Sequence, residues 1–175
     1  EAVKLVTNDR TIIIDASTAY RVDPQWVYGF PEMEDGHRVM IQRSKRSSNP
    51  AGYPPGFIAL TAPLVREGLI PAATPITVNA ISGYTGGGKG LIEEFQAQPS
   101  EITNDAFRTY GLTLSHKHVP EMTRYSGLDR APVFAPSVGR YAQGMLVEVP
   151  LHLWALPGKP TPKQLREALA DFYQG

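Results

Sequence analysis

Segments with the periodicity of strands alternate along this chain with segments of helical periodicity, and this alternation constrains the fold most strongly. The expected strands are 11–15, 75–81, a segment near 111–118, 133–141 and 145–156. The expected helices are a tail at 2–6, then 56–67, 91–95, about 120–125, and a last helix from Pro162. The β-branched run 11–15 should be buried, and the last two strands should form a hairpin. This order predicts an α/β (α+β) fold with a mixed, partly antiparallel sheet.

The last helix carries the clearest local signals. Thr161 is a good N-cap, Pro162 suits the first helical position, and Gln164 completes a capping box. The apolar face that should pack on the core comprises Leu165, Ala168, Leu169 and Phe172.

Composition excludes several classes of function. At 175 residues, 42% of them hydrophobic, the chain suits one domain or two small ones. Its 17 basic residues balance 17 acidic ones, so the net charge gives no support to binding of nucleic acid or a membrane surface. No apolar run reaches the ~18 residues of a transmembrane helix. The absence of cysteine excludes disulfides, thiolate metal sites and thiol catalysis, and it is compatible with a cytoplasmic protein.

A glycine-rich run follows the strand expected at 75–81. Gly83, Gly88 and Lys89 fit the spacing G-x-x-x-x-G-K of a P-loop, but Gly90 replaces the Ser or Thr that would hold Mg²⁺. Such a turn can present backbone N–H groups to an anion, or it can simply be a flexible turn. Binding of an anion, of a nucleotide triphosphate, or of nothing therefore all stay open here.

Two histidines and a carboxylate lie close together in the segment His116–Glu121. If this segment is a strand, His116 and His118 share one face. The three side chains could hold a metal, with Glu121 as the third ligand, or they could serve acid–base chemistry. They could equally be surface residues beside a turn.

Hydroxyl groups and an arginine follow the first expected strand, in Asp15–Arg21. Ligands of α/β proteins bind beyond the carboxyl ends of strands, and an arginine there can hold a carboxylate or a phosphate. The alternative is a helix cap with a surface arginine.

Five segments resemble, in order, the motifs of the N-acetyl-γ-glutamyl-phosphate reductases of the shorter sequence type. Asp15–Arg21 resembles D-x-S-x-x-x-R, and Trp26–Glu32 resembles W-x-Y-G-x-P-E. Asn49–Gly56 resembles the nucleophile loop N-P-G-C-Y-P-T-G, with Gly52 at the position of the cysteine. Ser82–Lys89 resembles S-G-x-S-G-x-G-[KR], and His116–Glu121 resembles H-x-H-x-P-E.

The resemblance implies a fold like the catalytic domain of glyceraldehyde-3-phosphate dehydrogenase. It implies the NADP-dependent reduction of N-acetylglutamyl 5-phosphate to the semialdehyde in arginine biosynthesis, by a cytoplasmic homo-oligomer. Residues 1–20 would be the end of a dinucleotide-binding Rossmann domain, and 21–175 a catalytic and dimerisation domain whose C-terminal part is incomplete.

The resemblance also assigns roles to individual residues. The catalytic positions would be Gly52, His116 and Glu121. The substrate would be held by Arg21, Tyr53, Ser82, Gly83 and Thr85. Gly86 and Gly87 would contact NADP, and no metal is implied.

The chain departs from the pattern of an active reductase. Gly52 has no side chain to attack an acyl phosphate, and no G-x-G-x-x-G dinucleotide fingerprint occurs. We therefore expect impaired reductase activity. The alternatives are a non-catalytic binding or assembly module of the same ancestry, with 133–141 and 145–156 as its oligomer surface, and a P-loop-like phosphate-binding domain.

The resemblance makes His116, rather than His118, the histidine that faces Gly52 across a cleft. Glu121 and Arg21 should lie on the same wall. An ionised Glu121 beside His116 would raise the pKa of that imidazole.

Overall fold

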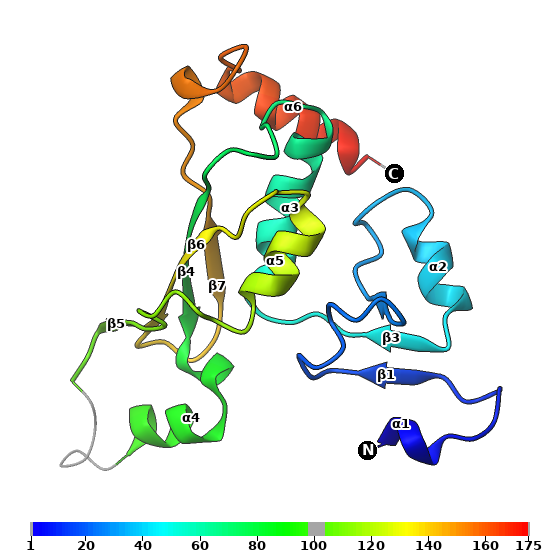
Figure 1. Ribbon diagram of the computed structural model, residues 1–175. Coiled ribbons are helices and arrows are strands. Elements are labelled where there is room, and N and C mark those ends of the chain that lie inside the picture. Colours follow the sequence, from blue (N-terminus) through cyan, green and yellow to red (C-terminus); the bar gives the residue numbers. More distant parts are fainter. Residues whose placement is uncertain (1, 98–103, 175) are drawn as a thin grey trace.

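Two separate β-sheets organise the chain in the computed structural model, which describes residues 2–97 and 104–174 (Figure 1). The first sheet is parallel, with the order β1 (Ile13–Asp15), β3 (Arg46–Ser48), β2 (Val27–Tyr28). The helices α1 (Ala2–Leu5) and α2 (His37–Arg43) belong to this part of the chain. The domain boundary expected at residue 20 falls within the span of this sheet.

The second sheet is mixed and carries most of the core. Its order is β5 (Phe107–Thr109), β6 (Val133–Gly139), β4 (Thr77–Gly83), β7 (Met145–Glu148). The central pair β4 and β6 is parallel, whereas β5 and β7 run antiparallel to their neighbours. The prediction of an α/β fold with a partly antiparallel sheet is therefore confirmed.

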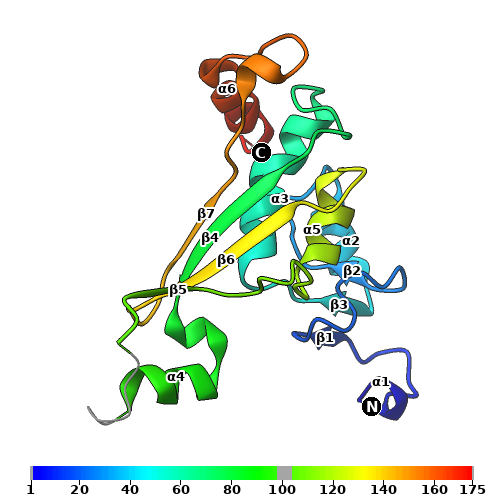
Figure 2. The same cartoon turned by 60° about the vertical axis from the view of Figure 1, so that its left-hand side comes forward.

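Two helices, α3 (Tyr53–Arg66) and α5 (Val119–Ser126), lie on the same side of the second sheet in both views (Figures 1 and 2). Phe57 and Leu64 of α3 join the core on that sheet, together with Val78 and Phe134. The opposite side of α3 contributes a second cluster, formed by Tyr28, Met33, Ile58 and Ala62. Helix α3 thus connects the two parts of the chain through apolar packing on both of its sides.

The remaining elements extend this arrangement. A 3₁₀ turn (Tyr84–Gly87) and α4 (Lys89–Gln96) follow β4, and a second 3₁₀ turn (Leu153–Ala155) precedes α6 (Pro162–Phe172). The capping box of α6 is confirmed, because the Thr161 side chain accepts from the backbone N–H of Gln164. The Gln164 side chain in turn accepts from the backbone N–H of Thr161.

The expected hairpin between 133–141 and 145–156 is wrong. Strand β4 lies between β6 and β7, so Ala80 pairs with Pro136 on one side and with Val147 on the other. The connecting turn passes the end of β4, where the N–H of Gly83 donates to the carbonyl of Gly144. The strand expected from 145 to 156 also ends early, at Glu148.

The strand expected near 111–118 is also wrong. This segment is a turn, because Gly111 and Leu114 have positive φ angles of 65° and 58°. The strand in this region lies earlier, at Phe107–Thr109. His116 and His118 therefore approach α5 from a turn rather than along a strand.

The first strand forms as expected but is not buried. Ile14 is 71% exposed and Ile12 is 56% exposed. Strand β1 lies at the edge of its sheet, and no other element of the described chain covers the side chains of Ile12 and Ile14.

Candidate active site

A cavity of about 800 Å³ lies where the two parts of the chain meet. Its walls come from the loop after β1, the turn before α3, the glycine-rich run after β4 and the turn before α5. The structure brings many of the expected site residues together here, namely Arg21, Gly52, Tyr53, Ser82, Gly86, Gly87 and His116. The position beyond the carboxyl ends of β1 and β4 is one where α/β folds bind ligands.

Gly52 precedes α3 in a conformation that suits only glycine. Its φ of 74° and ψ of −142° lie outside the regions that residues with a side chain adopt readily. A Cβ atom built on Gly52 would lie 2.9 Å from Cε1 of His118. The imidazole of His118 therefore borders the space in which a nucleophilic side chain would begin.

His118 is the histidine beside Gly52, so the prediction that placed His116 there is wrong. The cause is the turn before α5, in which His118 becomes the residue that precedes the helix. Its Nδ1 atom is buried and has no hydrogen-bond partner. Burial lowers the pKa of the His118 imidazole to about 4, and the neighbours His116, Arg21 and Lys117 add to this effect. The ring is therefore uncharged at neutral pH.

His116 also lines the cavity, next to His118. The two rings lie 4.7 Å apart between centroids, and Nδ1 of His116 accepts from the backbone N–H of His118 at 3.2 Å. Burial lowers the pKa of the His116 imidazole, and Lys117 adds to this. The prediction of a raised His116 pKa is wrong, because Glu121 is engaged elsewhere.

Glu121 forms a buried network with Arg21 and Tyr28. Its Oε1 accepts from Nη1 of Arg21 at 3.0 Å, and its Oε2 accepts from the hydroxyl of Tyr28 at 2.9 Å. All three residues are at least nine-tenths buried. Burial raises the pKa of the Glu121 carboxyl, whereas the guanidinium and the hydroxyl act in the opposite direction. The carboxylate thus anchors a neighbouring side chain and does not line the cavity.

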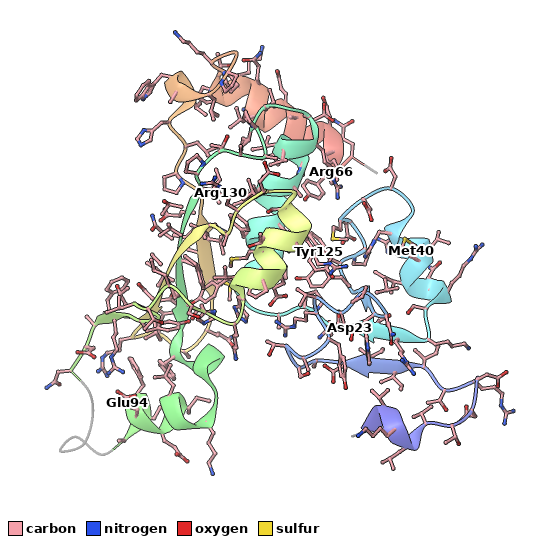
Figure 3. All side chains as sticks on the ribbon, viewed as in Figure 1. Asp23, Met40, Arg66, Glu94, Tyr125 and Arg130 are labelled. Carbon is pink, nitrogen blue, oxygen red and sulfur yellow. The ribbon has the colours of Figure 1, made fainter. Side chains whose placement is uncertain are left out.

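Arg21 ties the loops around the cavity together. Besides Glu121, its guanidinium donates to the carbonyl of Ala16 at 3.1 Å and to that of Ala51 at 3.4 Å. It is 4% exposed, so only a small part of it faces the cavity. Tyr125, labelled on α5 in Figure 3, adds to this junction, because its ring stacks on Tyr28 and its hydroxyl donates to the carbonyl of Arg21. The main role of Arg21 is therefore structural, because its hydrogen bonds hold α5 and the Gly52 loop together.

A group of hydroxyls forms another wall of the cavity. The Tyr53 hydroxyl lies 2.8 Å from Oγ of Ser82, 3.1 Å from the carbonyl of Ser137 and 3.4 Å from the Tyr110 hydroxyl. Burial raises the pKa of Tyr110, so its phenol stays protonated at neutral pH. The hydroxyls of this wall can donate to an oxygen of a ligand.

The glycine-rich run reaches the cavity only in part. Gly86 and Gly87 line it, whereas Gly83 and Thr85 do not and instead contact the turn 141–144. A Cβ atom on Gly83 would lie 2.6 Å from the carbonyl oxygen of Ala142, so glycine is needed there for packing. Lys89 is exposed and pairs with Glu93. The geometry therefore does not favour the P-loop interpretation.

Several lining residues were not assigned from the sequence. They are Ala16, Ser17, Thr18, Ala51, Leu91, Arg108, Tyr110, Lys117, His118, Val138 and Met145. Ser17, Thr18, Lys117 and His118 stand inside the motifs, so proximity to the assigned residues was an available signal. Arg108 reaches the cavity from β5 while bound to Asp105 and to Glu94, which Figure 3 labels on α4. No sequence pattern around Arg108 indicated this position, because β5 and α4 come together only in the folded chain.

A metal centre at His116, His118 and Glu121 is not formed. Both oxygens of Glu121 are bound by Arg21 and Tyr28. Within residues 2–97 and 104–174, no three side chains of His, Asp or Glu come together as ligands. In the same ranges, no helix has the length and apolar character needed to span a membrane.

Comparison with known proteins decides the family. Residues 52–175 match the family described as semialdehyde dehydrogenase, dimerisation domain. The chain belongs to this family. The matched region starts at residue 52, immediately before α3, so the four-stranded sheet and its helices form the family's domain.

Curated proteins similar to this chain include N-acetyl-gamma-glutamyl-phosphate reductases. "N-acetyl-gamma-glutamyl-phosphate reductase 2" of Nostoc sp. is 49% identical over 179 residues, which cover all of this chain and 56% of that protein. The N-acetyl-gamma-glutamyl-phosphate reductase of Rhizobium meliloti is 50% identical over 178 residues, or 57% of its length. The resemblance found in the sequence is confirmed, and the chain spans a little more than half the length of these relatives.

Proposed function

We propose that this chain forms the substrate-binding and dimerisation part of a protein of the N-acetyl-γ-glutamyl-phosphate reductase type, with N-acetylglutamyl 5-phosphate as the ligand of the cavity. The observation that carries the proposal is the convergence of four family motifs on one cavity beside the nucleophile position, Gly52. The similar curated proteins are named as N-acetyl-gamma-glutamyl-phosphate reductases, so the reduction of this ligand would belong to arginine biosynthesis.

The charge of the cavity suits this ligand. Lys117 brings positive charge to its walls, and Ser17, Thr18 and Ser82 bring hydroxyl groups, whereas Arg108 reaches the cavity already paired with Glu94 and Asp105. A phosphate and a carboxylate are the ligand groups that such side chains bind. We assign the anionic ends of the ligand to these residues, with Arg21 holding the loops that carry them.

The covalent route of a reductase is closed in this chain. In enzymes of the resembled type a cysteine thiolate attacks the acyl phosphate, and NADPH supplies the hydride that reduces the thioester. Gly52 offers no atom for that attack. Gly86 and Gly87 lie on the cavity wall and fit the nicotinamide end of NADP. A Cβ atom on Gly87 would lie only 2.3 Å from the Leu91 side chain, so packing also accounts for that glycine.

We assign the domain boundary near residue 50 instead of residue 20. The sheet β1-β3-β2 is parallel, and the exposed side chains of Ile12 and Ile14 suit the edge of a larger dinucleotide-binding sheet. Relatives nearly twice as long as this chain provide room for such a domain.

We also propose a homodimer formed through the open face of the second sheet. Helices α3 and α5 cover one face (Figure 2), and the other bears Phe107, Val133 and Leu146, each about half exposed. We take this exposed apolar sheet face as the interface, because exposed apolar patches are a feature of interaction surfaces. The family description, a dimerisation domain, agrees with this.

Binding measured by calorimetry tests the proposal. N-acetylglutamate 5-semialdehyde, added with inorganic phosphate, should bind to the protein. Lys117→Ala should weaken binding about tenfold, because it removes a charge-assisted contact on the cavity wall. Lys89→Ala is the matched control, since Lys89 is exposed on α4 and does not line the cavity. An unmodified protein that binds neither compound would refute the assignment of the ligand.

A non-catalytic binding module is the second candidate, and the missing side chain at position 52 favours it. Gly52→Cys, introduced into a chain that includes a dinucleotide-binding domain, separates the two candidates. A gain of phosphate-dependent oxidation of the semialdehyde by NADP would support the reductase ancestry of the site. A protein that binds the semialdehyde but shows no such gain would support the binding module.

A further inference from the structure

The buried Nδ1 atom of His118 has no hydrogen-bond partner, and the imidazole lies beside Gly52, which has no side chain. Nδ1 and Nε2 of His118 lie 3.7 and 3.8 Å from the position that a Cβ atom of Gly52 would occupy. His118 is 9% exposed, and none of the described polar atoms bonds its Nδ1. Buried polar atoms are nearly always satisfied, by protein or by water. We therefore infer that a small hydrogen-bond donor occupies the space between this nitrogen and Gly52.

Neutral imidazole accepts a hydrogen bond at one nitrogen. No side chain at position 52 fills the adjoining space, and the cavity of about 800 Å³ opens beside it. A water molecule needs little space and can also bond the ligand, and it reaches the buried Nδ1 once the imidazole shifts slightly toward the space beside Gly52. It would stand close to where the nucleophile of a reductase begins.

We propose that this site hydrolyses its acyl phosphate, with a water molecule held by His118 taking the place of the missing nucleophile at Gly52. This proposal rests on the proposed ligand class. The water oxygen bonds to the carbonyl carbon while Nδ1 of His118 takes its proton. The bond from that carbon to the phosphate oxygen then breaks. The products are the free carboxylate and inorganic phosphate, and no electrons are exchanged with a cofactor.

The surroundings of His118 support the role of a base. His116 is held in place by the backbone N–H of His118, and the ring of Tyr53 meets His118 edge-on. Positive charge from Lys117 on the cavity wall stabilises phosphate as the leaving group, whereas the charge of Arg108 is balanced by Glu94 and Asp105. The charge of Arg21, the remaining cation beside His118, is balanced by Glu121. An uncharged imidazole thus lies next to Gly52 and near the positive charge of Lys117.

Release of phosphate from acetyl phosphate and from N-acetylglutamyl 5-phosphate, corrected for spontaneous hydrolysis, tests the proposal. We expect His118→Gln to lower the protein-dependent rate about 100-fold, as for loss of a general base. His152→Gln is the matched control, because His152 is exposed and lies outside the cavity. In water labelled with ¹⁸O, the label should enter the carboxylate product, since attack occurs at carbon.

The outcomes separate this proposal from the proposed function. Binding of the semialdehyde without release of phosphate above the spontaneous rate would overturn hydrolysis and leave the ligand assignment intact. Absence of both would overturn both. Label found only in phosphate would also overturn the mechanism. If circular dichroism shows that His118→Gln does not fold, the role of His118 is tested instead by measuring how the rate of phosphate release by the unmodified protein depends on pH. That rate should fall as His118 takes up a proton, and a rate that persists in acid would refute the role of His118.

Discussion

Replacing Gly52 by alanine should destabilise the protein more than a single methyl group normally would. Two costs combine at this position. The backbone, at φ 74° and ψ −142°, lies where a residue with a side chain costs about 1–3 kcal/mol. The new Cβ atom would also approach Cε1 of His118 to 2.9 Å, so the ring or the loop must shift. We expect Gly52→Ala to lower the free energy of unfolding by about 3 kcal/mol.

Gly68→Ala provides the matched control. Gly68 follows α3 with a φ of 71°, and a Cβ atom there would have no neighbour within 4 Å. Its substitution should cost only about 1–2 kcal/mol, from the left-handed backbone alone. The difference between the two variants measures the extra strain of ψ at Gly52 and the contact with His118.

Urea unfolding at pH 7, followed by tryptophan fluorescence, measures both values. A double variant that adds His118→Ala to Gly52→Ala isolates the contact, and the two changes should cost less together than their sum by about 1 kcal/mol. Equal losses for Gly52→Ala and Gly68→Ala, with additive behaviour of the double variant, would refute the proximity of His118 to position 52. A cysteine at this position would face the same strain, so the loop must change conformation to present a thiol.

Three further predictions concern the network, the histidine and the open sheet. Glu121→Ala should lower the free energy of unfolding by about 3–5 kcal/mol, because it leaves the Arg21 guanidinium buried without a counter-charge, and stability equal to the unmodified protein would contradict this. The pKa of His118 falls from 6.5 to about 4 on folding, so the unfolded chain binds more protons between these values and stability should drop by about 3 kcal/mol as the pH falls from 6.5 to 4. Denaturation across this range should show a smaller drop for His118→Gln, and an equal drop would assign the effect to other groups. Leu146→Lys, on the open face of β7, should shift the protein from dimer to monomer in light scattering, whereas Trp154→Lys outside the sheet should not, and an unchanged dimer would place the interface elsewhere.

Local signals predicted the elements that depend on neighbouring residues alone. The capping box at Thr161 and Gln164 formed as expected, and so did the helix before Gly68, which adopts a positive φ. The hairpin failed because pairing is decided by the whole sheet. Strand β4 contributes the buried Val78 and Ala80 and takes the central position, which separates two strands that are adjacent in the chain.

The assignment of the histidines failed for a similar reason. Alternation along a strand would have placed His116 and His118 on one face, but the positive φ of Leu114 turns the chain before it reaches them. A leucine in this conformation gives no warning in the sequence. The turn places His118 at the start of α5, against Gly52, and places His116 one step further along the cavity wall.

The role of Arg21 shows what a motif can and cannot establish. The motif marked it as a residue near the site, and it does line the cavity. Its guanidinium, however, is directed to Glu121 and to the carbonyls of Ala16 and Ala51. These partners lie up to 100 residues away in the sequence, so only the folded chain reveals them. Because a buried cation must be paired, Arg21 and Glu121 depend on each other, and together they connect the Gly52 loop with the helix that follows His118. The shape of the site is therefore set by a contact between its two most distant motifs.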